Sequence, residues 1–302
     1  MDDRFLSDYP LKNWRKDLPE HRIPVIFGAT ASGKTQLSLA LAQAIDGEIV
    51  NMDALQIYKD LSIGTAKPTE AERKLVPHHL FDFLEPSKEY SVAQYQKEAQ
   101  EVIRKILSRN RTPILVGGTG LYLSSLYYDF TFREKRGDES VFRILYDKVG
   151  EEGILAILRE ENVEGLEDLD SKNPHRLFRA WQSKSVHSAK ERTRSDLPLV
   201  IFHLKQPRKT LHERIALRTQ KMLEEGLLEE VRGLLEAGFH GREPAMKGIG
   251  YTESIRYLQG EITLEELEER IVISTRQYAK RQLTWIRNQY SDVIALDGIC
   301  PV

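Results

Sequence analysis

A stretch near the start of the sequence has the residue types and spacing needed to hold phosphate. It runs from Pro24 to Thr35 and joins an apolar segment to a glycine-bounded loop. Gly28, Gly33, Lys34 and Thr35 match the G-x-x-x-x-G-K-[ST] pattern of phosphate-binding loops. The glycines let successive backbone N–H groups turn inward at a helix N-terminus, which makes an anion site. Lys34 adds a positive charge, and the Thr35 hydroxyl can bind a divalent cation.

An acidic residue follows the next apolar segment. Glu48 to Asp53 predicts a short strand that ends in a carboxylate. Ligands bind at the carboxyl ends of the strands in open α/β sheets, so we expect Asp53 to lie beside the phosphate loop. A second glycine-rich junction, Gly117 to Tyr122, comes after another strand-like run and can offer more backbone N–H groups. Such a junction is often only a tight turn, and we treat it as a candidate because of its place in the sheet.

Strand-like and helical segments alternate along most of the chain, which predicts a parallel sheet flanked by helices. This is an α/β, P-loop NTPase-like fold. Strand character is absent between about Asp129 and Asp196, where the pattern is helical and charged. We therefore predict a catalytic core made of residues 1–128 and 197–302, with an all-helical insertion domain at 129–196. Expected helices include 91–108, 212–235 with a break near Gly226, and 263–290, whereas 244–251 reads as a turn.

Two basic stretches indicate a polyanionic partner. From Lys172 to Arg194 there are seven lysines and arginines against one acid, Glu191. From Arg270 to Tyr290 there are five, with no acid, and Tyr278 and Trp285 are interleaved. Basic residues contact phosphates and aromatic rings can stack on bases, although aromatic residues at this spacing are equally often core residues. The seven cations of the first stretch are Lys172, Arg176, Arg179, Lys184, Lys190, Arg192 and Arg194.

The composition excludes several kinds of protein. The chain has 302 residues, a formal net charge of −2 and a single cysteine, Cys300, which excludes an internal disulfide and a thiolate metal cluster. No stretch is apolar over the roughly 18 residues of a membrane helix. Residues 1–22 have mixed charge without an apolar run, and we interpret them as a short extension rather than a secretory signal. These features predict a cytoplasmic protein, which we expect to be a monomer.

Several classes of protein use a phosphate loop. A GTPase should carry an Asn-Lys-x-Asp motif, which the sequence lacks. An ATPase of the common type needs a later strand ending in Asp with a nearby Glu, and Asp53 comes too early for that role. A small-molecule or nucleoside kinase, with Asp53 as the base for an acceptor hydroxyl, fits the strand order but leaves both basic stretches unexplained. A non-enzymatic RNA-binding module leaves Asp53 and the loop unexplained.

A series of motifs, in order, resembles the tRNA dimethylallyltransferases, also called tRNA isopentenyltransferases (the IPP transferase family). The resemblance extends from about Pro24 to Asp297. Its motifs are Gly28–Thr35, Asp53 with Gln56–Tyr58, Gly64–Pro68, Pro77–Leu80, Gly117–Tyr122, Asn173–Arg176, Gly248–Tyr251 and Arg276–Gln282. Gly64–Pro68 and Arg276–Gln282 are far more specific than the phosphate loop.

The resemblance implies transfer of a dimethylallyl group from its diphosphate to the N6 amine of adenosine 37, beside the tRNA anticodon. The loop would then hold the diphosphate leaving group rather than ATP, with Mg²⁺ bound through Thr35. Asp53 corresponds to the family's general base, and Thr119 corresponds to the threonine that contacts the flipped adenosine. Arg218 corresponds to a diphosphate-binding arginine, which acts with Lys34. The implied diphosphate-binding residues are Gly28, Ala29, Thr30, Ala31, Ser32, Gly33, Lys34, Thr35 and Arg218.

The resemblance also implies which segments contact tRNA. Besides Asp53 and Thr119, the expected contacts are Ala54, Leu55, Gln56, His175, Arg176, Leu177, Phe178, Arg179, Lys247, Gly248, Ile249, Gly250, Tyr251, Thr252, Arg276, Lys280 and Arg281. The sequence departs from the family pattern at three positions. Ala29 stands where Pro is usual, Ala54 replaces a common Ser, and Thr252 stands where Arg or Lys is usual. Ala54 removes one possible tRNA contact, Thr252 weakens one phosphate contact, and none of the three departures affects the inferred chemistry.

Overall fold

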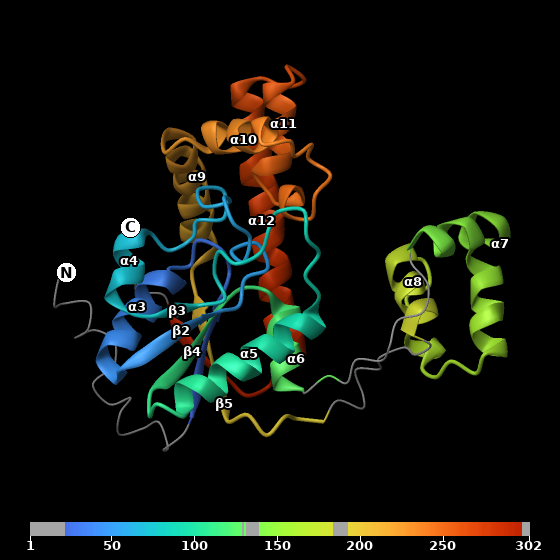
Figure 1. The fold of residues 1–302 in the computed structure, drawn as a ribbon, viewed down its shortest axis with the longest axis horizontal. Helices are drawn as coiled ribbons and strands as arrows, with labels where there is room; N and C mark the ends of the chain where they lie inside the picture. Colours follow the sequence, from blue (N-terminus) through green and yellow to red (C-terminus); the bar gives the residue numbers. More distant parts are fainter. Residues whose placement is uncertain (1–21, 129, 131–138, 184–192, 298–302) are drawn as a thin grey trace. The chain divides into compact units, whose positions relative to one another are not determined.

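A computed structural model of the chain describes residues 22–128, 130, 139–183 and 193–297. Residues 1–21 of the N-terminal extension, Cys300 and four members of the first basic stretch (Lys184, Lys190, Glu191 and Arg192) lie outside the described residues. The chain divides into two compact units. One combines Met1–Tyr127 with Asp196–Val302, and the other is Tyr128–Ser195 (Figure 1). The predicted domain limits at 129 and 196 lie one residue from this division.

The first unit is built on a parallel six-stranded sheet in the order β3-β2-β4-β1-β5-β6. The strands are β1 (Ile23–Gly28), β2 (Gly47–Asn51), β3 (His78–His79), β4 (Thr112–Gly117), β5 (Leu199–Lys205) and β6 (Val293–Asp297). Strand β1 is central, because it pairs with β4 on one side and β5 on the other, and all of its residues are buried. The predicted parallel sheet is therefore confirmed. The strand expected at residues 77–83 is only two residues long.

Four helices connect the strands of the first half of the chain: α3 (Lys34–Ile45), α4 (Glu70–Leu75), α5 (Val92–Leu107) and α6 (Gly120–Tyr127). Helix α5 begins with the predicted capping box of Ser91 and Gln94. Helix α4 was not predicted, although Thr69 and Glu72 form the same motif at its start. Apolar residues of α3 pack on the sheet in a cluster that includes Ile26, Leu37, Leu41, Ile49, Ile114 and Phe202.

The helices after β5 are α9 (Arg208–Glu224), α10 (Leu227–Glu236), α11 (Tyr251–Leu258) and α12 (Leu264–Gln289) (Figure 1). Gly226 has a φ of 99°, a conformation that side chains disfavour, and it separates α9 from α10 at the predicted break. The expected turn at 244–251 contains a short 3₁₀ helix, Ala245–Lys247, and ends where α11 begins. A buried cluster including Ile57, Leu61, Val231, Met246, Tyr251 and Leu267 joins these helices to the loop after β2.

The second unit consists of helices in its described part. These are α7 (Glu139–Glu160), a 3₁₀ turn at Leu166–Asp168 and α8 (Pro174–Ser183). Gly150, with a φ of 67°, introduces a kink within α7. The unit has its own core of Phe142, Ile154, Leu158, Leu177, Phe178 and Trp181. Within the described ranges of both units, no helix has the length and apolar character required to span a membrane.

Candidate active site

The phosphate loop connects β1 directly to the N-terminus of α3. Gly33 caps the helix in a left-handed conformation with a φ of 97°. In this described part of the chain, no side chain caps the first turn and no acidic residue lies in it, so the helix dipole favours an anion there. Gly28 is required for space, because a Cβ atom would lie 2.7 Å from Ser32 Oγ and 3.1 Å from the Leu204 carbonyl.

The Lys34 ammonium curls back over the loop. Its Nζ donates to the carbonyl oxygens of Gly28 and Ala29, at 3.1 and 2.9 Å. Burial, against the opposing charge of Asp53 and with a smaller contribution from the positive charge of Arg218, lowers the pKa of Lys34 to about 8. Burial also lowers the pKa of Arg218, with Asp53 again opposing the shift. The charges of Lys34 and Arg218 each interact with that of Asp53, which indicates that the three side chains lie near one another.

Asp53 is held by a hydrogen-bonded turn at the end of β2. Its backbone N–H donates to Asn51 Oδ1 at 2.9 Å, and its Oδ1 accepts the Leu55 N–H at 2.9 Å. The Asn51 amide donates in turn to the carbonyls of Asp53 and Leu80. These bonds fix the direction of the carboxylate while leaving Oδ2 available for a proton-transfer partner, which suits a general base.

Thr119 lies next to this turn. Its Oγ1 accepts the Ala54 N–H at 3.0 Å, and its own N–H donates to the Met52 carbonyl at 3.2 Å. The two strands can approach this closely because residue 117 is a glycine, where a Cβ would lie 2.1 Å from the Met52 carbonyl oxygen. The second glycine-rich junction therefore brings Thr119 to the backbone of Ala54, the residue after Asp53.

Gln282 on α12 joins the two glycine-rich loops. Its Oε1 accepts the Thr30 N–H at 2.9 Å, and its Nε2 donates to the Gly118 carbonyl at 3.0 Å. The side chain is 4% exposed. A Cβ on Gly118 would lie 2.0 Å from Gln282 Nε2, so the contact needs glycine. Gln282 was quoted within a motif but was not assigned a role from the sequence. Through these two hydrogen bonds, Gln282 fixes the position of the phosphate loop relative to the loop that carries Thr119.

The two aromatic residues of α12 pack inward. The Tyr278 hydroxyl lies within hydrogen-bonding reach of Thr119 and Gln282, and burial raises the pKa of Tyr278, with the charge of Asp53 adding to the shift. Trp285 donates from Nε1 to Ser124 Oγ at 3.3 Å, and its ring occupies the space a Cβ on Gly120 would need. The sequence left open whether Tyr278 and Trp285 stack on bases or pack in the core. In the structure both pack against the second glycine-rich loop.

The residues near the phosphate loop can be compared with the ligands that Mg²⁺ requires. Among the described residues, no cluster of three or more histidines, cysteines or acids is arranged to hold a metal ion. Mg²⁺ keeps several waters and is commonly held by one or two protein oxygens together with substrate phosphates. Thr35, at the start of α3, fits a cation of this kind, held chiefly by the substrate and water.

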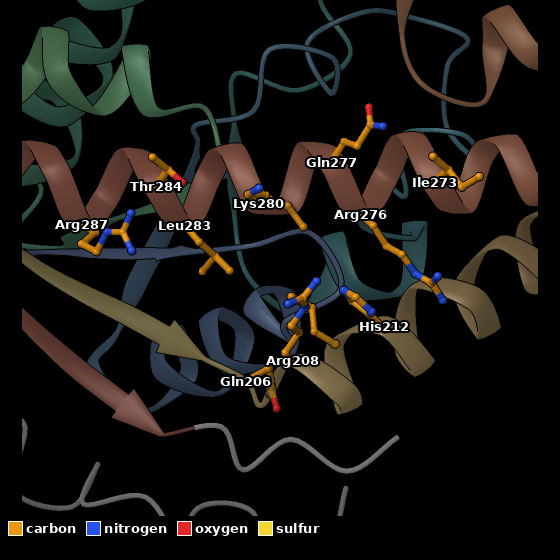
Figure 2. A pocket seen from close by; sticks show the side chains of 12 residues that line it. Gln206, Arg208, His212, Ile273, Arg276, Gln277, Lys280, Leu283, Thr284 and Arg287 are labelled. Carbon is orange, nitrogen blue, oxygen red and sulfur yellow. The ribbon is translucent and has the colours of Figure 1, made fainter.

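A basic groove lies between α9 and α12, with a volume of about 540 Å³. Figure 2 shows Arg276 extending from α12 toward His212 of α9. Burial, together with the charges of Arg276 and Arg208, lowers the pKa of His212. Arg276 and Lys280 line this groove, whereas Tyr278 and Gln282 contact the glycine-rich loops. Arg208, Lys209, His212 and Arg287 also line it or its extension, and none was singled out as a site residue from the sequence.

The predicted tRNA-contacting segment of α8 divides into exposed and buried positions. His175, Arg176 and Arg179 are exposed. Leu177 and Phe178 are 0% and 6% exposed and belong to the core of the second unit. The Leu177 and Phe178 side chains therefore pack in this core, and contact of these two residues with tRNA stays a prediction. The family resemblance grouped them with the three polar residues.

The segment from Lys247 to Thr252 shows the same division. Lys247 and Thr252 are exposed, and Ile249 is half-buried. Gly248, Gly250 and Tyr251 are buried. A Cβ on Gly248 would lie 2.8 Å from Leu55 Cδ1, which brings this segment against the loop after Asp53. The Gln56 amide donates to the carbonyls of Thr65 and Ala66 and so supports a neighbouring turn. Contact of these residues with tRNA stays a prediction.

Comparisons with known proteins match most of the chain to one family. The IPP transferase family model matches residues 56–289, and an isopentenyl transferase model matches residues 21–80. The tRNA dimethylallyltransferases of Pelotomaculum thermopropionicum and Bacillus velezensis are 38% and 39% identical to the chain, over 89% and 88% of its length and 88% of each relative.

Solved structures show the same likeness. The tRNA isopentenylpyrophosphate transferase of Bacillus halodurans has a TM-score of 0.70 at 36% identity, covering 92% of this chain and 90% of that one. A eukaryotic dimethylallyltransferase acting on tRNA has a TM-score of 0.76 at 28% identity, covering 92% and 74% of the two chains. The chain therefore belongs to the IPP transferase family.

Proposed function

We propose that the protein transfers a dimethylallyl group from dimethylallyl diphosphate to the N6 amine of adenosine 37 in tRNA. The observation that carries the proposal is the group formed by Lys34, Asp53 and Arg218, with Thr119 beside Asp53. It combines cations for a diphosphate with a carboxylate for an amine proton. Family membership supports the reaction class, and the names of the relatives state tRNA as the substrate.

The proposed reaction exchanges one bond for another. The adenine N6 attacks the allylic carbon, the bond from that carbon to the diphosphate oxygen breaks, and Asp53 accepts the N6 proton. Lys34, Arg218 and the N-terminus of α3 neutralise the charge that grows on the leaving diphosphate. Magnesium held through Thr35 would supply further charge neutralisation when bound. Thr119 and Tyr278 offer hydroxyl groups at the place where the flipped adenine would meet Asp53.

The exposed cations supply the proposed tRNA surface. On the first unit these are Lys247, Lys280 and Arg281, with half-buried Arg276, and on the second unit Arg176 and Arg179. We extend the proposal to a single chain acting on the anticodon arm in the cytoplasm. The small-molecule kinase alternative is not favoured, because the family match extends through α12, which that alternative leaves without a role.

The direct test incubates the protein with unmodified tRNA and labelled dimethylallyl diphosphate. Label in tRNA is the expected result, and ATP-dependent phosphorylation of a small acceptor without label in tRNA would replace the proposal with the kinase. The variant Asp53→Asn should reduce kcat by about 10²–10⁴-fold, the range of general-base catalysis, while tRNA affinity is retained. Asp60→Asn is the matched control, because Asp60 is exposed and its φ of 61° suits asparagine. Equal activity of the two variants would overturn the assignment of Asp53.

A further inference from the structure

The Gly64–Pro68 motif has no place in the chemistry above, and its first turn lies against a carboxylate from α10. The N–H groups of Ser62 and Ile63 donate to Glu230 Oε2 at 2.7 and 2.8 Å. The Gly64 N–H donates to Oε1 at 3.1 Å. Three successive backbone N–H groups that converge on one point form an anion nest. Here the anion is the protein's own Glu230.

Tyr251 completes the contacts of this carboxylate. Its hydroxyl donates to Glu230 Oε1 at 2.6 Å. Burial raises the pKa of Tyr251, and the charge of Glu230 raises it further, so the hydroxyl remains a donor. The ring lies 2.5 Å from where a Cβ on Gly64 would be, so the glycine backbone packs directly on the ring. Glu230 thereby joins two segments that are far apart in the sequence.

The turn held by Glu230 supports the loop that carries Asp53. Gln56 donates from Nε2 to the carbonyls of Thr65 and Ala66, at 3.0 and 3.1 Å. Gln56 lies three residues after Asp53, and Leu55 between them gives its N–H to the Asp53 carboxylate. From the other direction, the segment that ends in Tyr251 brings Gly248 against Leu55. Both connections of Glu230 therefore lead to residues 53–56.

We propose that Glu230 is a positioning residue for the acceptor side of the reaction. By holding the Ser62–Gly64 turn and the Tyr251 hydroxyl, it fixes the loop of Asp53 to Gln56 against which the adenosine is placed. The inference rests on the proposed function. The phosphate loop is held separately, by Gln282 and by Gln206, which donates to the Ser32 carbonyl at 3.0 Å. Loss of Glu230 should therefore affect use of tRNA and leave binding of the donor unchanged.

The test compares Glu230→Gln with Glu229→Gln. The change is the same, but Glu229 is exposed and pairs only with Arg232, at 3.6 Å, among the contacts of the described residues. A glutamine at 230 turns an N–H₂ group toward backbone N–H donors. We expect kcat/KM for tRNA to fall by at least about tenfold in Glu230→Gln, with the KM for dimethylallyl diphosphate within about twofold of wild type. Glu229→Gln should match wild type.

Two further variants test the route through Gln56. The losses of Glu230→Gln and Gln56→Ala should be less than additive in the double variant, because both act on one turn. If Glu230→Gln does not fold, Tyr251→Phe removes only the hydroxyl donor and should lower kcat/KM for tRNA by about threefold. Additive losses, a matching rise in the donor KM, or unchanged tRNA kinetics in the folded variants would overturn the inference. Absence of label in tRNA with the wild-type protein would instead contradict the proposed function.

Discussion

Helix α12 has two surfaces of different chemistry at the same level along its axis. Gln282 and Lys280 are two residues apart, which places them about 200° apart around a helix. Gln282 is buried and bonded to both glycine-rich loops, whereas Lys280 is exposed and lines the basic groove. The inner surface also carries Tyr278 and Trp285, and the outer surface also carries Arg276 and Arg287.

The difference indicates that the inner surface of α12 positions the loops of the site, whereas its outer surface attracts the charged tRNA. Uncharged groups with two defined partners, such as the Gln282 amide, fix the relative position of the loops that hold the donor and the acceptor. Cations with few partners act over a longer range and with less directional preference, and Arg276 Nε is buried without a hydrogen-bond partner in the described structure. We therefore expect inner-surface variants to alter kcat and the donor KM, and outer-surface variants to alter tRNA affinity.

Among variants of α12, the largest effect should come from Gln282→Glu. The new carboxylate still accepts the Thr30 N–H, but it faces the Gly118 carbonyl without a proton to donate and places negative charge beside the diphosphate. We expect kcat to fall about 100-fold, equivalent to about 2.7 kcal/mol, with a raised donor KM and unchanged tRNA affinity. Gln277→Glu is the control, because Gln277 lines the groove and is exposed. A lowered kcat in Gln277→Glu, with wild-type kcat in Gln282→Glu, would contradict the division of α12 into two surfaces.

The position of Gln282 also shows what the sequence could not predict. The phosphate loop, Asp53 and Thr119 each follow a strand directly, so strand ends and local motifs were enough to place them at one edge of the sheet. Gln282 meets Thr30 across 252 residues, and Glu230 meets Ser62 across 168. Helical periodicity shows which residues share a face of α12, but it does not show which loop that face contacts.

Buried and exposed members of a motif were also inseparable before the fold was known. Leu177 and Phe178 form core contacts within a segment whose neighbours Arg176 and Arg179 are exposed. The charge count of α12 likewise combined Arg276 and Lys280 in the groove with Arg281, and it left out the groove residues that α9 contributes. In contrast, helix α4 had a readable signal in Thr69 and Glu72, which the glycine and proline residues nearby obscured.

A smaller effect is expected from pH on binding of the donor, because the ammonium of Lys34 lies at the phosphate loop and its pKa is within reach of experiment. Its pKa is lowered from 10.5 to about 8 in the folded protein. The unfolded chain then holds more protons between these values, so the contribution of Lys34 to stability rises as the pH rises from about 8 to 10.5. Diphosphate favours the charged ammonium, and donor affinity should therefore fall above pH 8, by at most about tenfold per pH unit.

This pH dependence can be measured as the Kd of an unreactive diphosphate ester that is fully ionised over the whole range. Lys34→Met should bind the ester more weakly and with little pH dependence above 8. Equal slopes in the two proteins would assign the titration to another group. tRNA affinity, which we attribute to arginines and lysines outside the loop, should not follow the same curve.

The smallest effect per residue is expected on the outer surface. Arg276→Ala and Lys280→Ala should each weaken tRNA binding a few-fold at moderate salt, and each removed phosphate contact should lower the salt slope of log K by about 0.7–0.9. At saturating tRNA, kcat should equal that of wild type, because the glycine-rich loops keep their Gln282 contacts. Lys221→Ala is the control, since Lys221 is exposed and pairs with Glu225 at 3.6 Å. A lowered kcat with an unchanged salt slope would mean that the groove, like the inner surface, sets geometry.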